Sequence, residues 1–283
     1  MPDAAVTSLI AIDIGNTHAK AGRFDRSLDC EANAMGGVLP VAGPPLPTPV
    51  ERLGFDPAAD ADAFTAWLED QPLGELRVAI ASVNHANRER VEALLEAFAR
   101  DGNLERRVTL VTPEHLPLVV RVPEPGRVGI DRLVGAVAAN RLRRPEKPAV
   151  VVDLGTAITV DLIAADGAFE GGAILPGVAM AARALHQQTD LLPERPMREL
   201  DASPDAVGKN TADAIDAGLF WGAVGAVREV IARQSDRLTT APQVFVTGGA
   251  APSVARLLGG PDTAVRHVPD LVLSGIAVAS DQA

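Results

Sequence analysis

The sequence has 283 residues, and its hydrophobic fraction of 47% is enough for one large domain or two domains of ordinary size. Aromatic residues make up only 3% and Tyr is absent, so we expect a core of Ala, Val, Leu and Ile. The formal net charge of −11 argues against nucleic acid as a general partner, because a phosphate-binding surface needs a basic stripe.

The predicted location is the cytoplasm, with no membrane association. The single Cys30 cannot form an intramolecular disulfide, which suits a reducing compartment. No apolar run reaches the length of a membrane span, and the first residues lack the basic and apolar segments of a secretion signal.

The first half of the chain alternates between strand and helix patterns, which predicts βαβ units. The Gly- and Pro-rich residues 36–57 have no period and predict a long loop or weak strands, and 113–125 reads as extended. The expected elements are a hairpin at 8–25, a helix at 61–70, a strand at 76–83, a helix at 87–100, a strand at 107–111 and a helix at 129–142.

The second half opens with a run of β-branched residues and again mixes strands with helices. Residues 189–210 predict an irregular loop with many charges. The expected elements are strands at 149–154, 157–164 and 168–175, a helix at 178–186, a long helix at 211–235, a strand at 243–247 and helices at 253–258 and 271–280.

An internal repeat organises these elements. Asp13 and Asp153 each follow an apolar strand and each precede an apolar residue and a glycine, and they lie about half a chain apart. We therefore predict two duplicated lobes, residues 1–147 and 148–283, with a cleft between them.

The two Asp-x-Gly turns suit a nucleotide triphosphate held together with a cation. Glycine lets backbone N–H groups approach phosphate, and Asn16, Thr17 and Thr156 add neutral donors. The carboxylates would repel phosphate by roughly 4 kcal/mol at about 4 Å and an effective dielectric near 20, unless each holds a shared cation. Oxygen ligands suit Mg²⁺ or K⁺ and not zinc. The plainer alternative is two ordinary hairpin turns.

A second motif, Gly129-Ile130-Asp131-Arg132, stands at the start of an amphipathic helix. A carboxylate at Asp131 could accept a hydroxyl proton during phosphoryl transfer, and Arg132 could hold an anionic group. Asp131 serving only as a helix cap is the alternative.

Two glycine pairs complete the candidate site. Gly171-Gly172 precedes a Pro-Gly turn, and Gly248-Gly249 ends a strand where a base or ribose could lie. No G-x-x-x-x-G-K-[ST] and no G-x-G-x-x-G sequence is present, which excludes a P-loop NTPase and a dinucleotide fingerprint.

Four motifs in order resemble the type III pantothenate kinase family: residues 13–17, 129–132, 153–161 and 171–177. The resemblance covers about residues 9–279. It implies an α/β fold with two ribonuclease-H-like lobes of the acetate and sugar kinase, heat-shock ATPase and actin superfold. It also implies ATP-dependent phosphorylation of pantothenate, the first step toward coenzyme A, with Mg²⁺ and a monovalent cation, K⁺ or NH₄⁺.

The resemblance assigns roles to residues of this chain. It implies that Asp131 is the proton acceptor, that Asp153 binds the monovalent cation, and that Asp13 lies on the Mg²⁺ side. It also implies a homodimer, and the small residues Ala214, Gly218, Gly222 and Gly225 on the long helix suit close helix packing. The implied pantothenate contacts are Gly129, Ile130, Arg132 and Thr211, and the implied ATP contacts are Asp13, Gly15, Asn16, Thr17, Lys20 and Thr156. Gly248 and Gly249 join the expected ATP contacts because they follow a strand.

The chain departs from the family pattern at three places. Ile130 replaces a usual Ala, Val122 stands near a usual Tyr, and Asn84-His85 replaces Val-Pro. These departures leave two alternatives open: a kinase of the same fold for another hydroxyl acceptor, and a non-catalytic accessory protein resembling the Bvg accessory factor branch.

Overall fold

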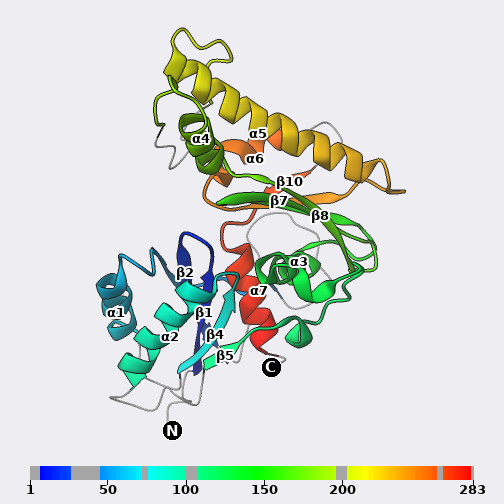
Figure 1. Ribbon diagram of the computed structural model, residues 1–283. Coiled ribbons are helices and arrows are strands. Elements are labelled where there is room, and N and C mark those ends of the chain that lie inside the picture. The colour runs from blue at the N-terminus through cyan, green and yellow to red at the C-terminus, as the bar shows by residue number, and fades with distance from the viewer. Residues whose placement is uncertain are drawn as a thin grey trace. The chain divides into compact units, whose positions relative to one another are not determined.

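The chain divides into two compact units, described here separately in a computed structural model (Figure 1). Unit 1 comprises 1–118, 123–144 and 270–283, and unit 2 comprises 119–122 and 145–269. The structure describes residues 7–26, 45–71, 76–99, 108–195, 203–259 and 264–281. Cys30 and parts of the predicted loops 36–57 and 189–210 lie outside these ranges.

Unit 1 is built on a five-stranded sheet with the order β3-β2-β1-β4-β5. Its antiparallel part pairs β1 with β2 and β2 with β3, and its parallel part pairs β1 with β4 and β4 with β5. The strands are β1 (Thr7–Ile14), β2 (Ala19–Arg26), β3 (Glu51–Phe55), β4 (Leu76–Ser82) and β5 (Val108–Leu110).

Four α-helices and two short 3-10 helices, η1 (Pro113–His115) and η2 (Pro125–Arg127), complete the described part of unit 1. Apart from Phe64, the apolar residues that the α-helices bury are Ala, Val, Leu and Ile, as the composition predicts. The central strand β1 is buried on both faces, since Ile10, Ala11 and Ile12 are each 0% exposed. Helices α3 and α7 lie side by side, so close that a Cβ at Gly275 would come 2.0 Å from the Val134 carbonyl (Figure 1). The helices are α1 (Ala61–Glu69), α2 (His85–Ala99), α3 (Ile130–Leu142) and α7 (Leu271–Ser280).

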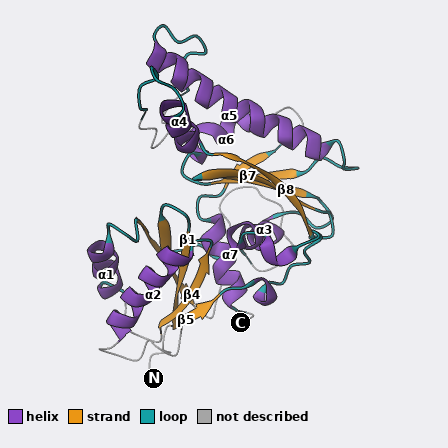
Figure 2. Ribbon diagram, in the orientation of Figure 1, coloured by secondary structure: helices purple, strands orange, loops and turns teal. Residues whose placement is uncertain are grey.

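Unit 2 repeats the same sheet with the order β10-β9-β6-β7-β8 (Figure 2). The pairs β6·β7 and β7·β8 are antiparallel, whereas β6·β9 and β9·β10 are parallel. The elements are β6 (Ala149–Leu154), β7 (Ala157–Ile163), β8 (Phe169–Pro176), α4 (Val178–Gln187), α5 (Thr211–Ser235), β9 (Gln243–Thr247), α6 (Ala251–Leu258) and β10 (Val265–His267).

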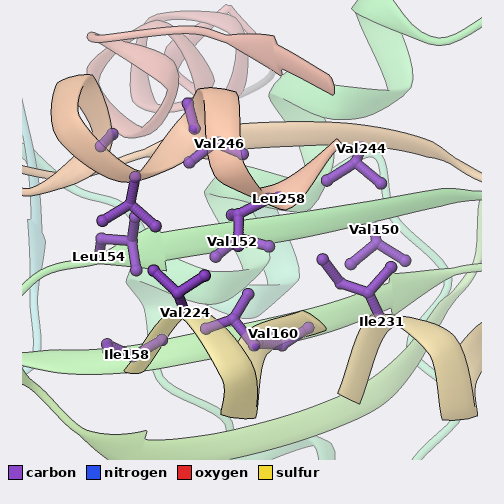
Figure 3. Packing of buried hydrophobic residues seen from close by; sticks show 14 of the residues in the cluster. Val150, Val152, Leu154, Ile158, Val160, Val224, Ile231, Val244, Val246 and Leu258 are labelled. Atoms are coloured by element: carbon purple, nitrogen blue, oxygen red, sulfur yellow. The ribbon is translucent and has the colours of Figure 1, made fainter. Parts of the chain in front are cut away.

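The core of unit 2 consists of valines from its central strands and apolar residues from its helices. Figure 3 shows Val150 and Val152 of β6 beside Val244 and Val246 of β9. Val224 and Ile231 of α5 and Leu258 of α6 belong to the same cluster. The central strand β6 is a nearly continuous run of buried apolar residues, whereas burial alternates along the edge strand β8.

The predicted fold class, two duplicated ribonuclease-H-like halves, is confirmed by the matching strand orders. Asp13 and Asp153 occupy the same place, one residue before the end of the first strand of each sheet. The domain boundaries differ from the expected break after residue 147, since 119–122 belong to unit 2 and 270–283 to unit 1. The reason is packing: α7 buries its apolar residues against α3 and β1.

Most predicted elements lie within two residues of their observed bounds, and two of the four edge strands, β3 and β10, are exceptions. Sequence patterning left β3 as a loop or weak strand and did not predict β10, because both are short and mostly exposed. Among the described helices, none combines the length and apolarity needed to cross a lipid bilayer.

Candidate active site

The first loop of the candidate site is the turn between β1 and β2 in unit 1. Asp13 pairs with Lys20 in the strand register, so their side chains emerge on the same face of the sheet. The Gly15 N–H donates to the His18 carbonyl at 3.0 Å, which closes the turn and leaves Asn16 and Thr17 exposed. Unit 1 thus brings together all five ATP contacts that were expected from residues 13–20.

One residue that sequence patterning missed supports this turn. The Asn87 side chain, only 7% exposed, lies on α2 and donates to the carbonyls of Gly15 and Asn16 at 3.3 and 3.4 Å. The signal available in the sequence was the pair Asn84 and Asn87, because the Asn84 side chain accepts from the Asn87 N–H at 2.9 Å, as a helix cap does.

The predicted acceptor motif lies beside this turn, within the same unit. A Cβ built at Gly129 would come 3.6 Å from Val83 Cγ1, and the Val83 N–H donates to the Ile14 carbonyl at 3.1 Å. Val83 therefore lies between Gly129, which precedes α3, and Ile14, which precedes Gly15. The two motifs meet at the carboxyl end of the parallel strands β1 and β4.

Asp131 lies in the first turn of α3 and is partly buried. Burial raises the pKa of its carboxyl, while the Arg132 N–H, which donates to Oδ1 at 2.8 Å, and the Arg132 charge oppose the rise. A Cβ at Gly129 would come 2.5 Å from this oxygen, so the glycine leaves room for the carboxylate. The arrangement suits a carboxylate that accepts a proton.

Unit 2 carries the second loop, formed by Gly155 and Thr156 between β6 and β7. Asp153 pairs with Thr159 on β7 and with Thr247 on β9. Gly248 follows Thr247 with a φ of 97°, and a Cβ there would come 2.5 Å from Asp153 Oδ1. Unit 2 therefore holds Asp153 against the backbone of the Gly248-Gly249 turn.

The same loop is closed on its other side by the end of β8. The Gly177 N–H donates to the Thr156 carbonyl at 3.2 Å, and a Cβ at Gly177 would come 2.3 Å from that oxygen. The Pro-Gly turn noted in the sequence is thus part of the packing around Thr156. The carbonyl oxygens of Gly155 and Thr156 face Gly177, and the Asp153 carboxylate faces Gly248.

Comparison with known proteins connects these two loops to one family. The model of the family described as type III pantothenate kinase matches residues 9–233. A type III pantothenate kinase of Phenylobacterium zucineum is 33% identical over 232 residues, which cover 80% of this chain and 86% of the relative. Another, from Parafrankia, is 30% identical over 278 residues and covers 97% of this chain and 98% of the relative.

The chain belongs to the type III pantothenate kinase family. The predicted family is confirmed, and with it the enzyme class, a kinase that uses ATP. A solved structure from Campylobacter jejuni, named as a Baf family transcriptional activator, shares the fold with a TM-score of 0.57 and 19% identity. It covers 96% of this chain and is itself covered to 97%.

The positions at which the chain departs from the family pattern have defined surroundings. Ile130 is 8% exposed, so its larger side chain is buried in the protein. Val122 belongs to unit 2, where its Cγ1 lies 3.4 Å from a Cβ built at Gly171. Asn84, at the place of the usual Val-Pro, caps the start of α2 by accepting a hydrogen bond from the Asn87 N–H.

Thr211, the remaining residue expected to touch pantothenate, is the exposed first residue of α5. Asn210 caps this helix by accepting from the Asp213 N–H at 2.9 Å. Gly208 precedes it in close contact, since a Cβ there would come 2.2 Å from the Ala214 nitrogen. Its contact with substrate stays a prediction.

Proposed function

We propose that this type III pantothenate kinase transfers the γ-phosphoryl group of ATP to the hydroxyl of pantothenate, with Asp131 as the proton acceptor. The observation that carries the proposal lies in unit 1, where Val83 lies between Gly129, just before the helix that carries the partly buried Asp131, and Ile14, just before the Gly15 turn. A phosphate-binding turn and a base with a raised pKa therefore share one end of a sheet.

Asp131 takes the proton that the substrate must lose. The pantothenate oxygen forms a bond to the γ-phosphorus while the bond from this phosphorus to the β,γ-bridging oxygen breaks and ADP leaves. The hydroxyl proton passes to Asp131. A raised pKa brings the carboxyl closer to working pH, which improves a general base.

The neighbouring residues supply binding and orientation. Arg132 carries a fixed positive charge next to the base, which suits the pantothenate carboxylate or the transferring phosphoryl group. Gly129 and Ile130 shape the backbone at this point, and Thr211 adds a hydroxyl from α5. Asn16, Thr17 and Lys20 bind phosphate oxygens, and Thr156, Gly248 and Gly249 bind the remainder of ATP.

Asp13 and Asp153 would each hold a cation, Mg²⁺ on the Asp13 side and K⁺ or NH₄⁺ at Asp153. Such cations would supply positive charge beside the phosphates. The oxygen-rich turn around Thr156 supports a hard cation at Asp153. Within the described ranges no three His, Cys, Asp or Glu side chains gather as metal ligands.

A homodimer is part of the proposal, and its support comes from α5. Ala214, Gly218, Gly222 and Gly225 are all exposed on this helix. Apart from its chain neighbours and the backbone of its own helix, no described atom lies within 4 Å of a Cβ built at any of the three glycines. Such a smooth surface suits a helix of a second copy. A cytoplasmic location is likewise proposed, because the single cysteine suits a reducing compartment.

The reaction is tested by ADP release from purified protein with ATP, Mg²⁺ and K⁺, with and without pantothenate. We expect pantothenate to stimulate release, with 4′-phosphopantothenate as the product. Turnover with a different alcohol alone would replace the acceptor, and no turnover with any acceptor or cation would overturn the kinase assignment.

The cation at Asp153 is tested by comparing Asp153→Ala with the unchanged protein across a K⁺ and NH₄⁺ series. We expect the dependence on monovalent cations to disappear in the variant. Persistence of the normal K⁺ activation would refute the role of Asp153.

The dimer is tested by light scattering on Gly222→Leu. The added side chain is expected to block helix contact and yield monomers, whereas Glu96→Leu, an exposed change on α2, leaves the mass unchanged. A dimer that survives Gly222→Leu would move the interface away from α5.

A further inference from the structure

Asn87 is a buried polar residue whose side-chain N–H groups face the Gly15 turn of unit 1. It is 7% exposed and lies in the first turn of α2, next to the end of β4. Burying an amide requires hydrogen bonds for its donors and its acceptor. Nδ2 reaches the Gly15 carbonyl at 3.3 Å and the Asn16 carbonyl at 3.4 Å.

Arg90, one turn further along α2, decides which way the Asn87 amide faces. Arg90 Nη1 donates to Asn87 Oδ1 at 2.8 Å. Because a guanidinium only donates, the atom facing Arg90 must be the oxygen, and the atom facing the turn must be the NH₂ group. The charge of Arg90 polarises the amide and strengthens its two N–H donors.

The hydrogen bonds from Asn87 also fix the direction of the N–H groups in the two peptide units whose carbonyls they hold. In a planar trans peptide the C=O of one residue and the N–H of the next point in opposite directions. Holding the Gly15 and Asn16 oxygens toward α2 therefore directs the N–H groups of Asn16 and Thr17 away from it. Two neighbouring N–H groups aimed outward form an anion-binding concavity.

We propose that Asn87, oriented by Arg90, is a positioning residue that presents the Asn16 and Thr17 N–H groups to the phosphates of ATP. The inference rests on the proposed ATP role of this turn, and it adds a residue that itself touches no substrate. Asn87 acts through the backbone, so its loss affects nucleotide binding and leaves pantothenate binding unchanged.

The test uses two variants at one position and a matched control on the same helix. Asn87→Leu keeps the branched shape of the side chain and removes the donors, and Asn87→Asp sets a carboxylate against two carbonyl oxygens. Asn84→Ala removes the helix cap without touching the turn. Calorimetric titration with ATP and the KM values for ATP and pantothenate are measured for each.

We expect ATP affinity to fall about tenfold in both Asn87 variants, as for a pair of lost hydrogen bonds, with the KM for pantothenate unchanged. Asn84→Ala lowers the melting temperature and keeps ATP affinity within about twofold. Equal losses of ATP affinity in Asn84→Ala and Asn87→Leu would overturn the positioning role.

Arg90 provides a second variant that is exposed and does not endanger folding. Arg90→Met keeps the stem and removes the guanidinium, and we expect about a threefold loss of ATP affinity. If Arg90→Met and Asn87→Leu both bind ATP like the unchanged protein, the inference is wrong.

Amide NMR signals of Asn16 and Thr17 separate this inference from the proposed function. ATP is expected to shift both signals in the unchanged protein and to shift them much less in Asn87→Leu. Equal shifts in both proteins would overturn the inference and leave the ATP site intact. Signals unmoved by ATP in the unchanged protein would overturn both.

Discussion

The two units share one sheet order but differ in what packs against the hairpin turn: a side chain in unit 1 and the backbone in unit 2. The turn of unit 1 has four residues, Gly15–His18, and a polar side chain from α2 binds its carbonyls. The turn of unit 2 has only Gly155 and Thr156, and the backbone of Gly248 packs directly against Asp153.

This difference follows from what comes after the fourth strand of each sheet. In unit 1 the chain continues through Val83 and Asn84 into α2, which leaves space for side chains behind the turn. In unit 2 it continues through Gly248 and Gly249 into α6, and the missing side chains let the backbone close in. One duplicated framework therefore has a longer turn backed by a side chain in unit 1 and a shorter turn packed against backbone in unit 2.

The largest effect is expected from removing Asp131 of unit 1, the base proposed for the reaction. Asp131→Asn should lower kcat by about 10²- to 10⁴-fold, the usual contribution of a general base. The amide oxygen can still accept from the Arg132 N–H, so the helix start is preserved. Product formation in a coupled ADP assay measures the loss, and a variant within tenfold of the unchanged enzyme would exclude Asp131 as the base.

The pH dependence of the same residue has a defined sign. Burial raises the pKa of Asp131 above its ordinary value, so the acid limb of kcat/KM lies higher than an exposed Asp would give. The folded state favours the protonated form, and the stability this contributes is present at low pH and lost as pH rises through the raised pKa. Asp131→Asn should therefore increase the melting temperature at pH 7 more than at pH 4, as scanning calorimetry can measure.

A smaller effect is expected from adding one carbon to the packed turn of unit 2. Gly248→Ala forces a left-handed φ and drives a Cβ against Asp153 and Leu154, a strain of roughly 1–3 kcal/mol in the free energy of unfolding. Gly249→Ala is the matched control, because no described atom lies within 4 Å of its Cβ, and it should change stability by less than about 0.5 kcal/mol. Chemical denaturation measures the free energy of unfolding of both variants. Equal losses in Gly248→Ala and Gly249→Ala would show that close packing at Gly248 is not what stabilises this turn.

The smallest effect concerns the segment 119–122, which joins the sheet of unit 2 beside β8. The Arg121 N–H donates to the Phe169 carbonyl at 2.8 Å, and its side chain pairs with Asp166 and Glu170. These ion pairs are exposed and screened by salt, so Arg121→Ala should lower the melting temperature only slightly, and less at high ionic strength. A large, salt-independent loss would show that the side chain, and not the backbone pairing, holds the segment.

The sequence predicted what repeats and what is strongly apolar. The strand–Asp–Gly pattern at Asp13 and Asp153 could be predicted because each Asp interrupts a buried strand at the same point. The valines at 150–152 predict a strand. Edge strands such as β3 and β10 carry few buried residues, so their pairing depends on neighbours that no local pattern reveals.

The supporting residues of the site were harder to predict for a related reason. Asn87 looks like any polar residue in a helical turn until the fold brings α2 against a loop 71 positions earlier in the chain. The same holds for Gly248, whose left-handed backbone is needed only because Asp153 lies beside it. Long-range contacts, and not local propensity, define these roles.

The position of α7 in the chain has a consequence for how the protein is made. This helix is the last described element, yet its apolar residues fill the core of unit 1 beside α3 and β1. Unit 1 therefore cannot close its core during synthesis until the ribosome has translated all of unit 2. Until α7 is made, one apolar face of the N-terminal sheet stays uncovered. The described strands and helices of unit 2 are all translated before α7.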